Sequence, residues 1–197
     1  MKVKIGVSAR HVHICREDLN FLFGDGYELT KFKNLDHPTE FASNEMVTVK
    51  TNKGEFRNVR LMGPLRDYTQ IEISKTDAYV LGLDPPVRPS SDVLGSEPIT
   101  IVYGDKELYK PYGCIIVDRH IHINKDDAKR FGLQNNMLVK AKLSGIKGGV
   151  IDNVRIAEDD DTENYQLHLD LDDANAHLAK TGDVAEIMKE DCSIVGW

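Results

Sequence analysis

The sequence predicts a mainly β protein made of two small β-barrel domains, which arise from an internal pseudo-repeat and are capped by short helices. Three observations support this fold class. The 197-residue chain repeats itself in outline, its apolar residues recur in short runs, and a proline-rich segment separates the two copies. The internal repeat is the most important of these observations, because a fold predicted without it would be wrong. Short apolar or alternating runs bounded by turn residues are typical of strands, and many such strands fit small barrels.

The repeat is clearest around an Arg-His-apolar-His motif that occurs twice. Residues 7–18 reappear in outline as residues 116–127. Three further matches follow in the same order: Met46 to Val49 with Met137 to Lys140, Asn58 to Leu61 with Asn153 to Ile156, and Gln70 to Ser74 with Gln166 to Asp170. Glu72 and His168 therefore occupy equivalent positions.

Each element follows from local patterns. Alternating or apolar runs bounded by Gly, Asn and Asp predict strands at 3–7, 46–50, 56–62, 99–103, 115–118, 138–143 and 165–169. Helices are expected at 16–23, 76–81, 125–131 and 172–180, because each pattern begins near Ser, Thr, Asp or Asn. Residues 84–89 form a connector, since prolines deny strand pairing to most of them.

The copies differ chiefly by an insertion in the first, near residues 24–44. His13 to Met46 spans 33 positions, whereas the equivalent His122 to Met137 spans 15. The inserted stretch contains turn residues, short apolar runs, and Lys31 and Lys33. A flap over a site and a surface hairpin both fit this pattern.

Composition narrows the class of protein. The formal charge of −7 is spread along the chain without a basic stripe, which argues against nucleic acid as a partner. No apolar run approaches the roughly 18 residues of a membrane span, and the first six residues are too short for a signal peptide, so we expect a cytoplasmic protein without a membrane partner. The three cysteines have no close spacing. Any metal must therefore rest on His and carboxylate.

The paired histidines predict two zinc sites. Residues i and i+2 of a strand point to the same side, so His11 and His13 can face one centre, as can His120 and His122. Catalytic zinc commonly takes three protein ligands. Glu72 and His168 supply the third at equivalent positions of the repeat.

The alternative is that these histidines are core or capping residues kept by duplication. Glu72 argues against it, because a carboxylate between Ile71 and Ile73 is costly to bury unless it is paired or bound to a metal. His37 and His177 lack comparable partners, and we expect both to be solvated.

Four blocks in order resemble the PduL-type phosphate propanoyltransferases over about residues 3–188. They are Ser8 to His13, Gly63 to Ser74, Arg119 to His122, and His168 to Ala176. The resemblance implies a two-barrel enzyme with two zinc ions that exchanges an acyl group between coenzyme A and phosphate, giving an acyl phosphate. It also implies one barrel from residues 1–9 plus 118–197, and another from 10–117.

Carried over residue by residue, the resemblance assigns one zinc to His11, His13 and Glu72. The other zinc falls to His120, His122 and His168. Arg66 would bind phosphate as the catalytic residue, and the contacts to coenzyme A would be Ser8, Lys33, Arg60 and Asn175. Met62 stands where the family has an apolar backbone contact.

The reaction that the resemblance implies requires the same groups, an arginine and a metal ion. Phosphate attacking a thioester brings an anion to a carbonyl that itself becomes negative, so cationic residues and a Lewis acid must offset both charges. No cysteine has the motif of an acyl-enzyme nucleophile, and we expect direct attack.

Other functions stay open on the sequence alone. His11, His13 and Glu17 reproduce the spacing of a cupin metal motif, although the second copy has Asp126 there. A non-catalytic, zinc-stabilised structural or shell-associated protein is a further alternative. Acetyl and propanoyl substrates both fit, and so do a homodimer and association with a bacterial microcompartment. Because only six residues precede Val7, with no targeting extension, we expect a free cytoplasmic enzyme.

Overall fold

The computed structural model describes residues 1–160 and 165–194. Contacts divide the chain into two compact units. One, called here the terminal unit, comprises Met1–Ser8, Asp36–Pro38 and Asp118–Trp197. The other, called the central unit, comprises Ala9–Leu35 and Thr39–Val117.

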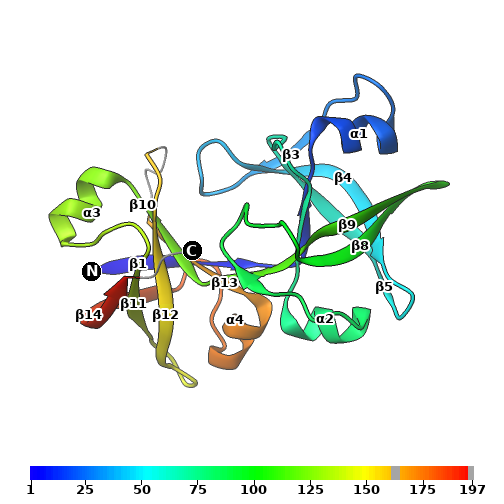
Figure 1. Cartoon of the computed structure of the whole chain (residues 1–197). Coiled ribbons are helices and arrows are strands. Elements are labelled where there is room, and N and C mark those ends of the chain that lie inside the picture. The colour runs from blue at the N-terminus through cyan, green and yellow to red at the C-terminus, as the bar shows by residue number, and fades with distance from the viewer. Residues whose placement is uncertain (161–164, 195–197) are drawn as a thin grey trace. The chain divides into compact units, whose positions relative to one another are not determined.

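A closed ring of strands forms the terminal unit (Figure 1). In ring order the strands are β1 (Lys2–Ser8), β13 (Gln166–Asp170), β10 (His120–Ile123), β12 (Gly149–Glu158), β11 (Met137–Leu143) and β14 (Val184–Ile194). β1 closes the ring because it pairs parallel with β13 and antiparallel with β14. A closed ring leaves none of these strands as an unpaired edge.

The central unit closes in the same way. Its ring runs through β4 (Phe41–Lys50), β5 (Glu55–Gly63), β2 (His11–His13), β6 (Gln70–Glu72), β9 (Lys106–Val117) and β8 (Glu97–Tyr103). β8 pairs with both β4 and β9, which completes the circle. Two short strands lie outside it, β3 (Lys31–Asn34) on β4 and β7 (Val87–Arg88) on β9. The predicted fold class, mainly β with two barrels, is confirmed.

Each barrel has its own apolar core. The apolar residue of each Arg-His-apolar-His motif belongs to it, since Val12 and Ile121 are both fully buried. Burying one such side chain contributes about 1.5–3 kcal/mol. Because neighbouring residues of a strand point to opposite sides, fixing Val12 or Ile121 in the core turns the flanking histidines to the other face.

Short helices follow the strands: α1 (Arg16–Phe23), α2 (Lys75–Leu81), α3 (Lys125–Phe131) and α4 (Leu171–His177). Ser74 and Asp77 form a reciprocal capping box at the start of α2. The side chains of Asn124 and Asp170 cap α3 and α4. α4 ends three residues before the predicted end at residue 180, because Leu178 takes a left-handed conformation that stops the helix.

The insertion in the first copy is an antiparallel hairpin of β3 and β4. This agrees with the surface-hairpin alternative, and a role as a flap stays a prediction. Residues Asp36–Pro38, between the two strands, belong to the terminal unit. Among the described residues, no helix is long and apolar enough to cross a membrane.

Candidate functional site

A group of two histidines and a glutamate, the first triad, lies on neighbouring strands of the central unit. β2 runs between β5 and β6, and its register places His11 opposite Glu72. Nε2 of His11 is 3.2 Å from Nε2 of His13 and 3.3 Å from a carboxylate oxygen of Glu72. Nε2 of His13 is 3.5 Å from the other oxygen. The structure thus brings together the three residues predicted as one ligand set.

Backbone contacts orient His11 within this triad. Its Nδ1 lies 2.9 Å from the carbonyl oxygen of Ala9. A carbonyl can only accept, so Nδ1 carries the proton and donates, which leaves the lone pair of Nε2 directed at the triad. A neutral imidazole in this tautomer is the form that binds a metal ion.

The charges in the first triad also suit a cation. Burial alone would raise the pKa of Glu72, but His11 and His13 outweigh it and hold that pKa well below its ordinary value. Burial lowers the pKa of His13, whereas for His11 the Glu72 carboxylate overcomes burial and the pKa is raised. Two imidazoles and an ionised carboxylate are a donor set that zinc uses. These residues therefore fit a divalent metal.

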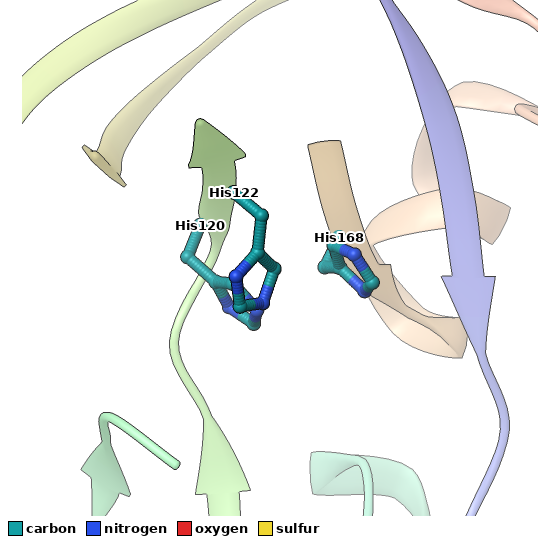
Figure 2. A group of neighbouring side chains, drawn as sticks. All are labelled: His120, His122 and His168. Atoms are coloured by element: carbon teal, nitrogen blue, oxygen red, sulfur yellow. The ribbon is translucent and has the colours of Figure 1, made fainter. Parts of the chain in front are cut away.

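Three histidines form the second triad, in the terminal unit. Figure 2 shows His120 and His122 on one strand, with His168 on the neighbouring strand facing them. His120 is directly opposite His168 in the antiparallel pairing, and their rings stack with centroids 4.9 Å apart. One nitrogen of each ring lies within 4.8 Å of the others. Three imidazoles at this spacing also fit zinc, and a role as ligands stays a prediction for both triads.

The second triad repeats the orientation of the first. Nδ1 of His120 lies 2.8 Å from the carbonyl oxygen of Asp118, as that of His11 does from Ala9. The equivalent backbone carbonyl therefore fixes the tautomer of the first histidine in each triad.

Arg66 lies beside the first triad, on the loop between β5 and β6. Its backbone N–H donates to the carbonyl of Ile14, just beyond β2. Its guanidinium donates to the hydroxyl of Ser90 at 2.9 Å and pairs with Glu40 at 2.9 Å. Burial lowers the pKa of Arg66, but nearby Tyr68 and the Glu40 and Glu72 carboxylates outweigh it and raise that pKa. Arg66 is thus a cation held among hydrogen-bonding groups.

Ser90 connects Arg66 to the triad. Its hydroxyl lies 3.4 Å from a carboxylate oxygen of Glu72 and accepts from the Gln70 amide at 2.9 Å. The same amide donates to Glu72 at 2.6 Å. Sequence reasoning missed Ser90, Gln70 and the Glu40 partner of Arg66. Of these three residues, only Gln70 could have been recognised in the sequence as a neighbour of the triad, because it stands two residues before Glu72 and shares its side of the strand.

The phosphate propanoyltransferase family matches residues 4–180 of the chain. The chain belongs to this family. It is 45% identical over 186 residues to a phosphate propanoyltransferase of Thermotoga maritima, covering 94% of this chain and 88% of that relative. Its identity to one from Clostridioides difficile is 42% over 190 residues, covering 95% and 90%. The protein is therefore an acyltransferase, which argues against the cupin-like and the non-catalytic alternatives.

The geometry of this acyltransferase agrees with that outcome. Glu17, which the cupin alternative requires as a ligand, is exposed on α1. Glu72 instead completes the group with His11 and His13.

The other predicted substrate contacts are divided between the units. Lys33 is exposed on β3 of the central unit. Arg60, on β5, lies opposite His11, stacks over Phe32 with 4.7 Å to the ring centroid, and donates to the carbonyl of Ser43. In the terminal unit, Ser8 ends β1 and Asn175 is exposed on α4.

The arginine of each motif has a structural partner. Arg10 pairs with Asp77 in the first turn of α2, and Arg119 pairs with Asp173 in the first turn of α4, both at 2.6 Å. These equivalent pairs fasten each helix to the strand that carries the histidines. The arginines are therefore repeated for reasons of structure.

The prediction that His37 is solvated is wrong. Its side chain is 15% exposed, and Nε2 lies 2.9 Å from a carboxylate oxygen of Asp159. The same oxygen lies 3.1 Å from Nδ1 of His122 in the second triad. The sequence places His37 far from Asp159, so only the fold reveals this partner. His177 is half-buried, with Nδ1 3.1 Å from the carbonyl oxygen of Lys147.

Proposed function

We propose that this acyltransferase converts an acyl-CoA and inorganic phosphate into an acyl phosphate and coenzyme A, at a site formed by the first triad and Arg66. The guanidinium of Arg66 is joined through the hydroxyl of Ser90 to Glu72, so a cation suited to phosphate stands beside a ligand set suited to zinc.

Arg66 would hold the attacking phosphate. A guanidinium presents a planar fork of N–H donors that matches phosphate oxygens, and hydrogen bonds between charged partners are about twice as strong as neutral ones. The Glu40 carboxylate already accepts from this fork at 2.9 Å. An oxyanion thus fits there, and phosphate would replace that carboxylate.

His11, His13 and Glu72 would hold a zinc ion, which would supply a Lewis acid for the thioester carbonyl and a soft partner for the departing thiolate. The backbone carbonyl of Ala9 orients the ring of His11 through Nδ1, and the pair of imidazoles keeps Glu72 ionised. His120, His122 and His168 would hold a second zinc.

We further propose direct attack, without an acyl-enzyme. A phosphate oxygen forms the bond to the carbonyl carbon, the C–S bond breaks, and the thiolate of coenzyme A leaves. Burial raises the pKa of the Cys114 thiol to about 12, so it stays protonated. Cys15 accepts a hydrogen bond from the Thr69 hydroxyl. The side chain of Cys192 lies outside the described residues.

The acyl group is propanoyl or acetyl. The relatives are named for propanoyl, and one methylene changes the free energy of discrimination by only ~1–3 kcal/mol. Contacts of Ser8, Lys33, Arg60 and Asn175 with coenzyme A stay predictions, as do a homodimer, microcompartment association and a cytoplasmic location.

Thiol release from propanoyl-CoA and acetyl-CoA, with and without phosphate, tests the proposal. We expect release only with phosphate, and loss of about 10²–10³-fold in kcat/KM for phosphate in Arg66→Met. Arg57→Met is the matched control, because Arg57 is exposed on β5. Phosphate-independent release, or none, would contradict the reaction. A labelled acyl group that stays on denatured enzyme would contradict direct attack alone.

A further inference from the structure

The guanidinium of Arg66, to which we assign phosphate, already holds a carboxylate. Its Nη2 donates to Oε1 of Glu40 at 2.9 Å, while its Nη1 donates to the hydroxyls of Ser90 at 2.9 Å and Tyr68 at 3.2 Å. The side chains of Arg66 and Glu40 are 22% and 27% exposed, so an anion from solution can reach the pair. An anion that binds this guanidinium must therefore displace the Glu40 carboxylate or share the donors with it.

Glu40 cannot move far from Arg66, because its backbone is held on both sides. Its carbonyl accepts from the N–H of Leu35 at 3.1 Å, across the hairpin. The next residue, Phe41, begins β4 opposite Gly63, and its ring lies so close that a Cβ on Gly63 would clash with it. Gly63 is three residues before Arg66 in the chain. The displaced carboxylate thus stays within side-chain reach of whatever binds the guanidinium.

Two carboxylates lie around Arg66, and only one of them belongs to the first triad. The Ser90 hydroxyl that accepts from Arg66 also lies 3.4 Å from a carboxylate oxygen of Glu72. A metal ion held with His11 and His13 would offset the charge of Glu72, whereas Glu40 lies outside that ligand group. An incoming anion therefore meets the full negative charge of Glu40.

A carboxylate in this place distinguishes oxyanions by their protons. An ionised carboxylate can only accept hydrogen bonds. Inorganic phosphate keeps at least one proton near neutral pH and can donate it to an oxygen of Glu40, which makes a strong, charge-assisted hydrogen bond. Sulfate has the same tetrahedral shape but no proton at this pH, so its oxygens would face the carboxylate as like charges. Repelling a competitor in this way gives specificity.

We propose that Glu40 makes the Arg66 site selective for oxyanions that carry a proton, so that phosphate binds and sulfate is excluded. Arg66 attracts either anion, and Glu40 accepts the proton that only phosphate offers. Phosphate as the ligand of Arg66 rests on the proposed function, whereas the selectivity assigned to Glu40 goes beyond it.

Glu40→Gln tests the selectivity, because the amide keeps the shape of the side chain, removes its charge and can donate to sulfate. Calorimetry on the zinc-loaded enzyme at pH 7 measures the affinities for phosphate, arsenate and sulfate. We expect wild type to bind arsenate, which is protonated like phosphate, and to bind sulfate much more weakly. In Glu40→Gln the affinity for sulfate should rise roughly 10- to 100-fold, the scale of a like-charge contact, and that for phosphate should not rise.

Two further variants serve as controls. Glu28→Gln is the matched control, because Glu28 pairs with Arg16 at 2.8 Å on an exposed surface, and it should leave the affinity for sulfate unchanged. Adding Arg66→Met to Glu40→Gln should abolish the gain in sulfate affinity. Inhibition of thiol release gives a second measurement, since sulfate should compete with phosphate in Glu40→Gln at lower concentrations than in wild type.

Failure of the phosphate site and failure of the Glu40 role give different results. If Arg66→Met binds phosphate as tightly as wild type, the proposed phosphate site has failed and its selectivity fails with it. If phosphate binding needs Arg66 but sulfate binds wild type and Glu40→Gln equally, only the role of Glu40 is overturned. An equal rise in Glu28→Gln overturns it as well. Should Glu40→Gln not fold, Glu40→Ala removes the same charge and is measured in the same way.

Discussion

The two triads share a scaffold and differ in charge. In both, an apolar residue fixed in the barrel core turns two histidines outward, a backbone carbonyl orients the first histidine, and an arginine fastens the next helix. The first triad ends on the anion Glu72 and has the cation Arg66 nearby. The second ends on His168 and has the Asp159 carboxylate near His122.

A duplicated fold can diverge at some positions more readily than at others. Positions that point into the barrel or hold the helix stay equivalent, because changing them affects folding. Positions that point outward differ between the copies. The loop before Glu72 carries the cation Arg66, whereas the loop before His168 carries the anion Asp159. The chemistry can thus be asymmetric although the scaffold is symmetric.

The strongest test of the comparison is to make the triads alike. We expect Glu72→His to keep a metal but to lose activity by about 10³-fold, because the anion that balances the cationic site is gone. Metal content and thiol release measure the two effects. Glu17→Gln, on the exposed face of α1, should change neither. An active Glu72→His enzyme would show that the asymmetry of the triads is irrelevant.

Core substitutions should affect both barrels equally. Ile71 pairs with Val12 and Leu167 pairs with Ile121, and all four are fully buried. We expect Ile71→Ala and Leu167→Ala each to lower the free energy of unfolding by about 2–5 kcal/mol, since both leave cavities. Urea unfolding measures this. A loss confined to one variant would mean that the barrels are not equivalent in packing.

The helix-fastening pairs should differ in strength. Asp77 is buried and also belongs to the capping box of α2, whereas Asp173 is more exposed. We expect Asp77→Asn to lower stability by about 1–3 kcal/mol and Asp173→Asn by about 0.5–1 kcal/mol, because solvent weakens the exposed pair. Thermal unfolding of both variants checks the order. The reverse order would contradict the role of burial.

The contact between the insertion, absent from the second copy, and Glu45, just after it on β4, should add a pH-dependent contribution to stability. Burial would raise the pKa of Glu45, but hydrogen bonds from Thr30 and Tyr27 outweigh it and lower that pKa. A lowered pKa stabilises the fold above the ordinary value of 4.5, and this contribution is lost as pH falls through the folded pKa. We expect Glu45→Gln to lower stability by about 1–2 kcal/mol at pH 7.

Denaturation of wild type and Glu45→Gln from pH 7 down to pH 3 measures this contribution. The difference between the two proteins should shrink in the acid range. A difference that stays constant with pH would exclude Glu45 as its source.

The sequence predicted the fold class and the membership of both triads well, because these depend on local patterns and on the repeat. Alternation placed the histidines of β2 and β10 on one side of each strand. Ring closure depends on pairings between distant residues, such as β1 with β13, which no local pattern contains. β12 and β14 were not predicted, because their mixed polar sequences have no clean alternation.

The hydrogen-bond and ion-pair partners of the site residues could not be predicted from the sequence either. Ser90 follows the proline-rich connector and has no motif, yet its hydroxyl lies between Arg66 and Glu72. The repeat shows that Asp118 stands where the first copy has Ala9. The ion pair of Asp118 with Arg155 could not be predicted, because Arg155 lies 37 positions later and is brought to Asp118 only by the parallel pairing of β10 with β12.

The pairing of β1 has a consequence for synthesis. In the sequence, the residues of the central unit come after β1 and before the other strands of the terminal ring. The central ring can therefore close while the later residues are still being made. β1 must wait for β13 and β14. During that interval it is an unpaired apolar strand, and the exposed, charged Lys2 and Lys4 oppose its association with other nascent chains.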